Sequence, residues 1–393
     1  MKSHPFDYQM KTIVHARENG IENVPSLFRH MGAKRVVLFS DKGLEAFGVV
    51  DRCADIFNRQ ADVTLAGTFT AIEPDAACRN INEAIAYARD CGADAILAVG
   101  GGSVIDASKG VKYALDRGLA DIRGVIAGGG RLEVWPESQG FDTPHIAVPT
   151  TAGTGAEASP IAVFFNEEEN IKASLVASGL EADIAILDPC MTTGLPKGLT
   201  RSTAFDALTH AVEALVSPLS NSFTDAYAMQ ATRLIIDNLP RALEAPGDTA
   251  ARGALLQAST MAISAFYSSL GGIPIHNCAH AFGAVGHIPH GDANTVLMPV
   301  VIAALPEFYG PKIGKLASAL GLMPEADDAR TLASVVAFLK DFQKRIGADT
   351  TFSAWALDDE QKKRIMETVK KDMAYQFYAI RDEKIAQIVN GVA

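Results

Sequence analysis

The sequence contains few cysteines and no paired cysteine motif. Five of the 393 residues are cysteine, and they lie far apart without forming a Cys-x-x-Cys pair. A disulfide framework or a structural zinc knot is therefore not expected, and the pattern fits a reducing cytoplasm. We expect most of these cysteines to pack as small buried side chains.

Long apolar runs and excess positive charge are also lacking. No uncharged apolar run reaches the roughly 18 residues that a bilayer-spanning helix needs. Residues 1–20 contain no apolar signal-peptide core, so a secretory signal is not expected. Lys and Arg number 35 against 46 Asp and Glu, a formal net charge of −11, which argues against nucleic acid or an anionic membrane as partner. These absences predict a cytoplasmic protein.

The first half of the sequence alternates short apolar, β-branched runs with helical stretches. Continuous apolar strands separated by helices are typical of a parallel sheet that is covered on both faces. The patterns predict strands at 35–40, 62–66, 95–99, 145–148 and 184–187, and helices at 51–60 and 75–91.

The pattern changes near residue 190, where long helical stretches broken by proline and glycine begin to dominate. They cover 202–216, 224–238, 249–269, a stretch from His276, and 325 to the end. We therefore predict an α/β domain over 1–190, with a parallel sheet and flanking helices, followed by an all-α domain over 191–393.

Two loops of the first half combine glycines with hydroxyl groups. The first, Gly100-Gly101-Gly102-Ser103, follows a buried strand and precedes a helix, so its backbone could approach a pyrophosphate at a helix N-terminus. A carboxylate such as Asp106 in the first turn of that helix is favourable with or without a function. The second loop, residues 149–157 (PTTAGTGAE), suits a phosphate or a ribose. A plain structural turn is the alternative for each loop.

Asp41 stands at the end of the first clear strand. A carboxylate there could bind a ribose hydroxyl and repel a 2′-phosphate, which favours NAD over NADP. Lys42 beside it weakens the exclusion of NADP. A turn or helix-cap aspartate is the competing interpretation.

Four of the nine histidines fall within fifteen residues, at His276, His280, His287 and His290. The first two are four residues apart, so on a helix they share one face. The Pro-His-Gly sequence at 289–291 predicts a break between that helix and the last histidine.

Asp206 and His210 form a second pair at helical spacing, within an otherwise apolar stretch. A carboxylate on an apolar face needs a partner, and a divalent cation shared with the histidines would provide one. Imidazoles with one carboxylate suit Zn²⁺ or Fe²⁺ rather than Mg²⁺ or Ca²⁺. Two helices with hydrogen-bonded core histidines are the alternative.

Taken together, these motifs resemble the iron-containing (group III) alcohol dehydrogenase family. The resemblance extends from residues 34–43 to about Pro299. It is carried by GGGS at 100–103 with Asp106, PTTAGTGAE at 149–157, ILDP at 186–189, DALTHAVEA at 206–214, and the spacing His276-x3-His280-x9-His290-Gly291.

The resemblance implies roles for individual residues. It implies a metal, Fe²⁺ with Zn²⁺ as the alternative, and a catalytic histidine, His280, beside it. The implied metal ligands are Asp206, His210, His276 and His290. The residues expected around NAD, with NADP the less favoured cofactor, are Asp41, Gly100, Gly101, Gly102, Ser103, Asp106, Thr150, Thr151, Thr154 and Lys172.

The sequence departs from the family pattern at three places. Ala204-Phe205 replaces the small residue and the Gly or Met that are common before the first implied ligand, and Glu181-Ala182 stands where a proline is common. Residues 378–382 lack the Asn-Pro-Arg of many members. The implied ligand set is intact, so these departures put the substrate in doubt and not the chemistry.

The resulting hypothesis is an oxidoreductase that transfers a hydride between NAD(H) and a small primary alcohol or aldehyde. His280 is the candidate for the first step of a proton relay, and His287 either touches substrate or binds nothing. By resemblance, a homodimer or larger homo-oligomer is expected. The alternatives are a glycerol-dehydrogenase-type zinc polyol dehydrogenase, a metallohydrolase, and a non-catalytic nucleotide-binding regulator.

Overall fold

The computed structural model describes residues 5–134 and 138–392, which form two compact units. Met10–Gly194 is one unit, and the other consists of the chain from Leu195 onward together with the N-terminal segment that ends at Gln9. That segment joins the helical unit because the ring of Tyr8 stacks on Phe223 and Tyr227, with centroids 5.2 and 5.9 Å away. Each unit is therefore built around its own core.

The first unit contains a six-stranded parallel sheet in the order β1-β9-β6-β4-β2-β3. The expected α/β architecture with a parallel sheet is confirmed. The sequence pattern does not predict the short edge strand β1, whose end residues are exposed. The strands are β1 (Ile13–Ala16), β2 (Arg35–Phe39), β3 (Thr64–Phe69), β4 (Ala95–Gly100), β6 (His145–Pro149) and β9 (Ile184–Leu187).

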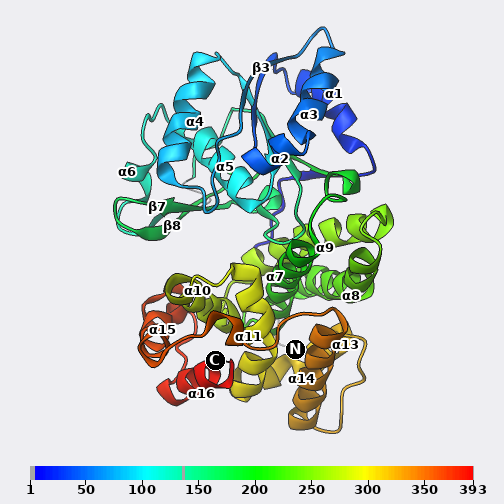
Figure 1. The fold of residues 1–393 in the computed structure, drawn as a ribbon, viewed down its shortest axis with the longest axis vertical. Coiled ribbons are helices and arrows are strands. Elements are labelled where there is room, and N and C mark those ends of the chain that lie inside the picture. Colours follow the sequence, from blue (N-terminus) through cyan, green and yellow to red (C-terminus); the bar gives the residue numbers. More distant parts are fainter. Residues whose placement is uncertain (1–4, 135–137, 393) are drawn as a thin grey trace. The chain divides into compact units, whose positions relative to one another are not determined.

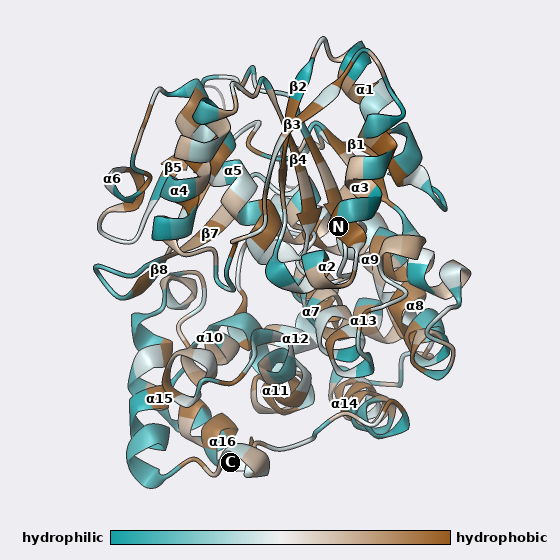
Figure 2. Cartoon of the chain, turned by 45° about the horizontal axis from the view of Figure 1, so that its top comes forward, coloured by the Kyte–Doolittle hydropathy of each residue, from teal (hydrophilic) through white to brown (hydrophobic). Residues whose placement is uncertain are grey.

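Helices cover both faces of this sheet because successive strand side chains point in opposite directions. Val37 and Phe39 pack beneath α4 (Cys78–Asp90) and α5 (Gly102–Asp116), whereas Val36 and Leu38 pack beneath α1 (Val24–His30) and α3 (Val49–Asn58) (Figure 1). Figure 2 shows the central strands as hydrophobic. Each fully buried aliphatic or aromatic side chain contributes about 1.5–3 kcal/mol.

A smaller sheet, which the sequence pattern does not predict, lies beside α5. It has the order β5-β8-β7, and β7 and β8 form an antiparallel hairpin. Phe164 and Leu175 anchor this hairpin in the same apolar core as α4 and α5. The strands are β5 (Gly130–Glu133), β7 (Ile161–Asn166) and β8 (Ile171–Ala177).

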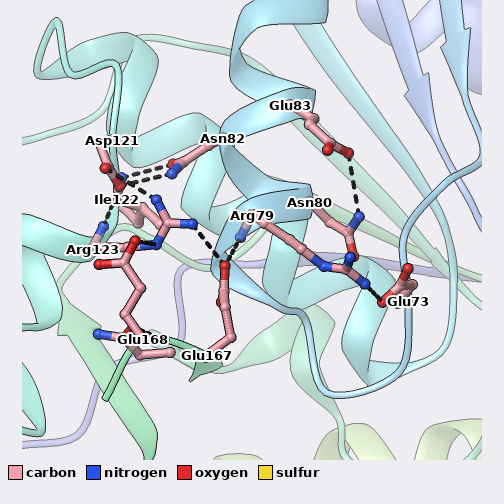
Figure 3. Close-up of polar contacts among 11 residues, drawn as sticks. Glu73, Arg79, Asn80, Asn82, Glu83, Asp121, Ile122, Arg123, Glu167 and Glu168 are labelled. Atoms are coloured by element: carbon pink, nitrogen blue, oxygen red, sulfur yellow. Dashed lines mark hydrogen bonds and ion pairs between the residues drawn. The ribbon is translucent and has the colours of Figure 1, made fainter. Parts of the chain in front are cut away.

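A polar network fastens the hairpin turn to α4 (Figure 3). Helix α4 begins without a side-chain cap from Ala77, and Glu167 of the turn accepts a hydrogen bond from Arg79 N at 2.9 Å instead. The same Oε1 accepts from Arg123 Nη2 at 2.7 Å. Partial burial raises the pKa of Glu167, but the hydrogen bond from Arg123 and the other donors outweigh it, so the pKa lies below its ordinary value.

The second unit is helical, as expected. Its central helix, α7 (Lys197–Val216), is buried along almost all of its second half. The other helices are α8 (Ser222–Glu244), α9 (Thr249–Ser268), α10 (Pro274–Gly286), α11 (His290–Ala304), α12 (Pro306–Tyr309), α13 (Ile313–Ala319), α14 (Asp328–Arg345), α15 (Asp359–Lys371) and α16 (Asp382–Val392).

Helix α11 approaches α7 very closely at Gly291. A Cβ atom added there would overlap the carbonyl oxygen of Ser202, a backbone atom of α7. Only glycine therefore permits this contact, which lies one residue after His290. Glycine at this position brings the start of α11 against the helix that carries Asp206.

Among the described residues no single helix is long and apolar enough to cross a membrane. One pair of consecutive segments, His290–Ala304 and Pro306–Ala319, has the combined length and apolar composition of a membrane-spanning helix, but the chain bends by 84° between them. All five cysteines are described and none forms a disulfide, and Cys53, Cys78 and Cys278 are buried as expected.

Replacing the remote cap of α4 is expected to weaken the first unit. Glu167→Gln removes the charge that Arg123 and the helix N-terminus bind, so the free energy of unfolding should fall by about 1–2 kcal/mol at neutral pH. Because the folded-state pKa of Glu167 is lowered, its contribution is present above the unfolded value and is lost as the pH falls below about 4.5. Urea unfolding of both proteins at several pH values measures this. If the difference in free energy of unfolding between the two proteins grew as the pH fell, the proposed contribution of the Glu167 charge would be contradicted.

Replacing the close-contact glycine of α11 is expected to weaken the second unit. Gly291→Ala pushes the Cβ against the Ser202 carbonyl, and overpacking of this kind typically costs about 1–3 kcal/mol. The control is Gly314→Ala in α13, where the nearest atoms lie 3.9 Å from the added Cβ and helix propensity improves. Thermal melting should show a lower Tm for the first variant only. Equal melting temperatures would refute the packing argument.

Candidate metal centre

Helix α7 presents two carboxylates and one imidazole on a single stripe. Asp206, His210 and Glu213 have the spacing i, i+4, i+7, which places them on one helix face. All three are buried, with exposed fractions of 4%, 7% and 1%. A helix that buries two carboxylates needs compensating groups from its neighbours.

Helices α10 and α11 supply two of those groups. His276 lies in the first turn of α10 and His290 begins α11. Asp206 Oδ1 lies 3.6 Å from His276 Nε2 and 3.3 Å from His290 Nε2. One donor atom from each of these three residues lies within 4.8 Å of the other two, so together they could hold a metal ion.

His210, the fourth expected ligand, stands beside this group but is not part of it. Its ring stacks on that of His276, with centroids 4.7 Å apart and an angle of 16°, and lies 4.8 Å from the ring of Phe266. The structure therefore brings three of the four expected ligands into mutual reach and places the fourth against one of them.

His280 lies one turn beyond His276 on α10, at the edge of the cluster. Its ring centroid is 5.4 Å from that of His290, and its side chain is 42% exposed. Its Nδ1 lies 2.9 Å from Asp372 Oδ2, which fixes the direction of the ring. His287 is the C-cap residue of α10 and has φ of 53°, a left-handed conformation that ends this helix before α11 begins at His290.

Opposite charges dominate the electrostatics of the centre. Burial raises the pKa of Asp206, but His210, His290 and His276 outweigh it and hold the pKa well below its ordinary range. Burial lowers the pKa of His276, but Glu213 and Asp206 outweigh it and raise the pKa to about 9. The centre is therefore an environment that favours a cation.

One buried nitrogen tests whether a metal fits these residues. His276 Nε2 is buried, points toward Asp206, and makes no hydrogen bond to any residue that the structure describes. Buried imidazole nitrogens normally find a partner. An imidazole nitrogen beside a carboxylate and a second imidazole is a donor set that Zn²⁺ or Fe²⁺ accepts. The residues present fit a divalent metal.

Three residues around this cluster are missed by reasoning from the sequence. Asn294 Nδ2 donates to Asp206 Oδ1 at 2.9 Å and lies 3.1 Å from His290 Nε2. Glu213 binds His276, and Asp372 binds His280. The seven-residue spacing from Asp206 to Glu213 was the available signal for one of them, but Asp372 lies 92 residues from its partner, and no local pattern indicates that pairing.

The two glycine- and threonine-rich loops lie together in the α/β unit. Strands β2, β4 and β6 are neighbours, so Asp41, residues 100–103 and residues 150–154 follow them at one edge of the sheet. The chain order reverses between β2 and β4, the kind of switch point where open parallel sheets bind ligands. Thr150 N donates to Gly100 O at 3.0 Å and joins the loops.

Close contacts explain two of the glycines, one between the two loops and one between the first loop and the helix that follows it. A Cβ atom at Gly102 would lie 2.8 Å from Thr154 Cγ2, and one at Gly100 would lie 2.5 Å from Val104 Cβ. Helix α5 begins at Gly102 with no side-chain cap on its first N–H groups from its N-cap residue, Gly101. Such a helix start is suited to a phosphate.

The remaining expected cofactor residues have protein partners in this structure. Asp41 Oδ1 accepts from Leu44 N at 2.9 Å and caps α2 (Lys42–Ala46). Asp106 pairs with Lys109 at 3.2 Å and accepts from Val163 N at 3.1 Å.

Lys172 and Ser103 meet through a residue that was not expected to take part. Lys172 Nζ lies 2.6 Å from Asp75 Oδ1, and Asp75 N donates to Ser103 Oγ at 3.0 Å. Asp75 therefore connects a residue of the small sheet to the loop after β4. Thr151 borders the same loop at Gly101, with its side-chain atoms 3.4 and 3.5 Å from an added Cβ.

Comparisons with known proteins give the family. Residues 11–189 match the family model described as iron-containing alcohol dehydrogenase, and residues 200–392 match that of the Fe-containing alcohol dehydrogenase family, C-terminal. Aldehyde-alcohol dehydrogenase 2 of Entamoeba histolytica is 35% identical over 72% of this chain, which spans 32% of that protein's length. The 1,3-propanediol dehydrogenase of Klebsiella pneumoniae is 36% identical over 75% of this chain and 74% of its own.

Comparison with solved structures points to the same family as the sequence comparisons. A crystal structure of 1,3-propanediol oxidoreductase matches with a TM-score of 0.91 and 30% identity, covering 99% of this chain and all of the other. The resemblance expected from the motifs is confirmed over both halves of the sequence. The chain belongs to the iron-containing alcohol dehydrogenase family, a family of oxidoreductases.

Proposed function

We propose that this chain is a metal-dependent oxidoreductase that transfers a hydride between NAD(H) and a small primary alcohol or aldehyde. The observation that carries the proposal is the group of Asp206, His276 and His290, whose donor atoms lie within 4.8 Å of one another; Asp206 and His276 are buried, and the exposed His290 side chain forms the open side of the group. Family membership supports the reaction class, and the paired loops at the sheet edge support a dinucleotide.

The metal ligands proposed are Asp206, His276 and His290, with His210 as the fourth. Fe²⁺ is the metal proposed, with Zn²⁺ as the alternative, because the donor set suits both. The chemistry that such a metal supplies is Lewis-acid stabilisation of negative charge on a substrate oxygen. Phe266, 9% exposed and 5.1 Å from the His276 ring, keeps water from one side of this group.

The proposed dinucleotide site uses the glycine-rich loop and the start of α5. The N–H groups of residues 101–103 would bind the pyrophosphate, which Gly102 allows to approach closely. The proposed site also includes four residues that border this loop or connect to it: Thr150, Thr151, Thr154 and Lys172. Asp41 at the end of β2 favours NAD over NADP through a ribose hydroxyl.

His280 is proposed to receive the proton that leaves the alcohol. Since its Nδ1 is bonded to Asp372, the proton of the neutral ring sits on Nδ1 and Nε2 keeps a lone pair. A general base needs this arrangement: one nitrogen held and the other accepting. Asp372 is thus a positioning residue for His280.

The alternative functions have less support. A metallohydrolase would have no use for two phosphate-binding loops, and a non-catalytic regulator would have no use for the metal donors. The family models that match cover both halves of the chain and favour an alcohol dehydrogenase over either, as well as over a glycerol-type polyol dehydrogenase.

The substrate class, the oligomeric state and the cellular compartment are also proposed. The relatives named for 1,3-propanediol make short alcohols and diols the first substrates to test. A homodimer or larger homo-oligomer is proposed by resemblance. Five cysteines without a disulfide support a reducing cytoplasm.

The function is tested by elemental analysis of protein purified without air, together with NADH absorbance against a panel of alcohols and aldehydes. We expect about one iron or zinc per chain and turnover that a chelator abolishes. A fully active metal-free protein would refute the metal-dependent mechanism. Metal without nicotinamide-linked turnover on a broad panel would favour the hydrolase instead.

The role of Asp372 is tested by Asp372→Ala, with Asp382→Ala as a control on a surface aspartate paired with Lys370. Loss of the bond to His280 Nδ1 should lower kcat by about ten- to a hundredfold, with a smaller change in KM and with metal content unchanged. Asp372→Asn, whose Oδ1 still accepts from Nδ1–H, should recover part of the rate. If Asp372→Ala retains the kcat of the control variant, Asp372 does not position the base.

A further inference from the structure

The proposed chemistry leaves one buried carboxylate beside the metal centre without a role. Glu213 is 1% exposed and lies two turns along α7 from Asp206. Its Oε1 accepts a hydrogen bond from Ile275 N at 2.6 Å, and its Oε2 lies 2.5 Å from His276 Nδ1. Because burying an ionised carboxylate is costly, both contacts are needed to keep it there.

The first contact fixes where α10 begins. Helix α10 starts at Pro274 and receives no side-chain cap from its N-cap residue, Ile273. Glu213 takes over that role from α7, where a carboxylate also interacts favourably with the positive end of the helix dipole. His276, in the same first turn, is thereby held at a fixed place relative to Asp206.

The second contact decides which nitrogen of His276 carries the proton. A histidine that binds a metal does so as the neutral imidazole, and because an ionised carboxylate can only accept hydrogen bonds, the single proton of the metal-binding His276 ring lies on Nδ1. Nε2 then keeps its lone pair, and it faces Asp206 Oδ1 at 3.6 Å. A metal-binding histidine is commonly oriented by a carboxylate on its other nitrogen in this way.

We infer that Glu213 is a positioning residue, which turns the Nε2 lone pair of His276 toward a divalent metal by holding the proton of the ring on Nδ1. The inference deepens the proposed function and rests on the metal site proposed there. It concerns metal affinity rather than a step of the reaction, so it can be tested without knowing the substrate.

A glutamine at position 213 cannot reproduce both contacts. If its oxygen accepts from Ile275 N, its NH₂ faces His276 Nδ1 and favours the tautomer with the proton on Nε2, the nitrogen needed for the metal. If the amide is reversed, NH₂ meets the Ile275 N–H and two donors oppose each other. Either arrangement weakens the metal site with almost no change in side-chain size.

The experiment measures Zn²⁺ affinity of the full chain, stripped with a chelator, by competition with a chromophoric chelator. Glu213→Gln should bind Zn²⁺ about 10- to 100-fold more weakly than the wild type. Glu167→Gln is the matched control, because Glu167 also accepts from the first turn of a helix, at Arg79 N, but lies in the other unit. The control should keep the wild-type dissociation constant.

Selective ¹⁵N-histidine NMR of the Zn²⁺-loaded wild type keeps the inference testable if Glu213→Gln does not fold. The His276 signals, assigned by their loss in His276→Gln, should show a proton on Nδ1 and a metal-bound Nε2. A proton on Nε2 would overturn the inference.

The outcomes separate this inference from the proposed function. Zn²⁺ binding by the wild type with an unchanged dissociation constant in folded Glu213→Gln would overturn the role of Glu213 and leave the metal site standing. A wild type that binds no Zn²⁺ or Fe²⁺ would overturn both.

Discussion

The burial of the Asp206 carboxylate is the constraint on which the centre depends. Asp206 is only 4% exposed, and a charged carboxylate buried in this way is stable only if positive or hydrogen-bond-donating groups surround it. His276, His290 and Asn294 approach its Oδ1 from α10 and α11. Those two helices are in turn held by Glu213 and by the close contact at Gly291. The contacts that pack α10 and α11 against α7 therefore also place the groups that surround Asp206.

Features that repeat over short distances could be predicted from the sequence. The spacing of Asp206 and His210, and of His276 and His280, follows from one helical turn, so each pair shares a helix face as expected. Apolar runs predict five strands of the large sheet, and they are clearest in the interior strands β4 and β9, which are fully buried because both of their faces are covered. The position of each glycine- and threonine-rich loop after an apolar strand could also be predicted, but the pairing of those two strands, β4 and β6, is seen only in the structure.

Features that depend on distant residues could not be predicted. Glu213 meets His276 across 63 residues, and Asp372 meets His280 across 92, so no local pattern relates them. Strand β7 begins with the apolar run IAVFF, but β8, with the sequence IKASLVA, mixes polar and apolar residues, and no local pattern indicates that the two strands pair in a separate sheet with β5. Lys172 has Asp75 as its partner, which only the folded chain brings near. His210 stacks on the ring of His276 beside the mutually close group, and its part as the fourth ligand stays a prediction.

Anomalous diffraction at the iron or zinc absorption edge, from crystals of the metal-loaded protein, tests the central claim most directly. The claim predicts a strong peak between Asp206, His276 and His290, with His210 completing the donor set. A metal peak elsewhere, with these side chains arranged as they are without metal, would contradict it.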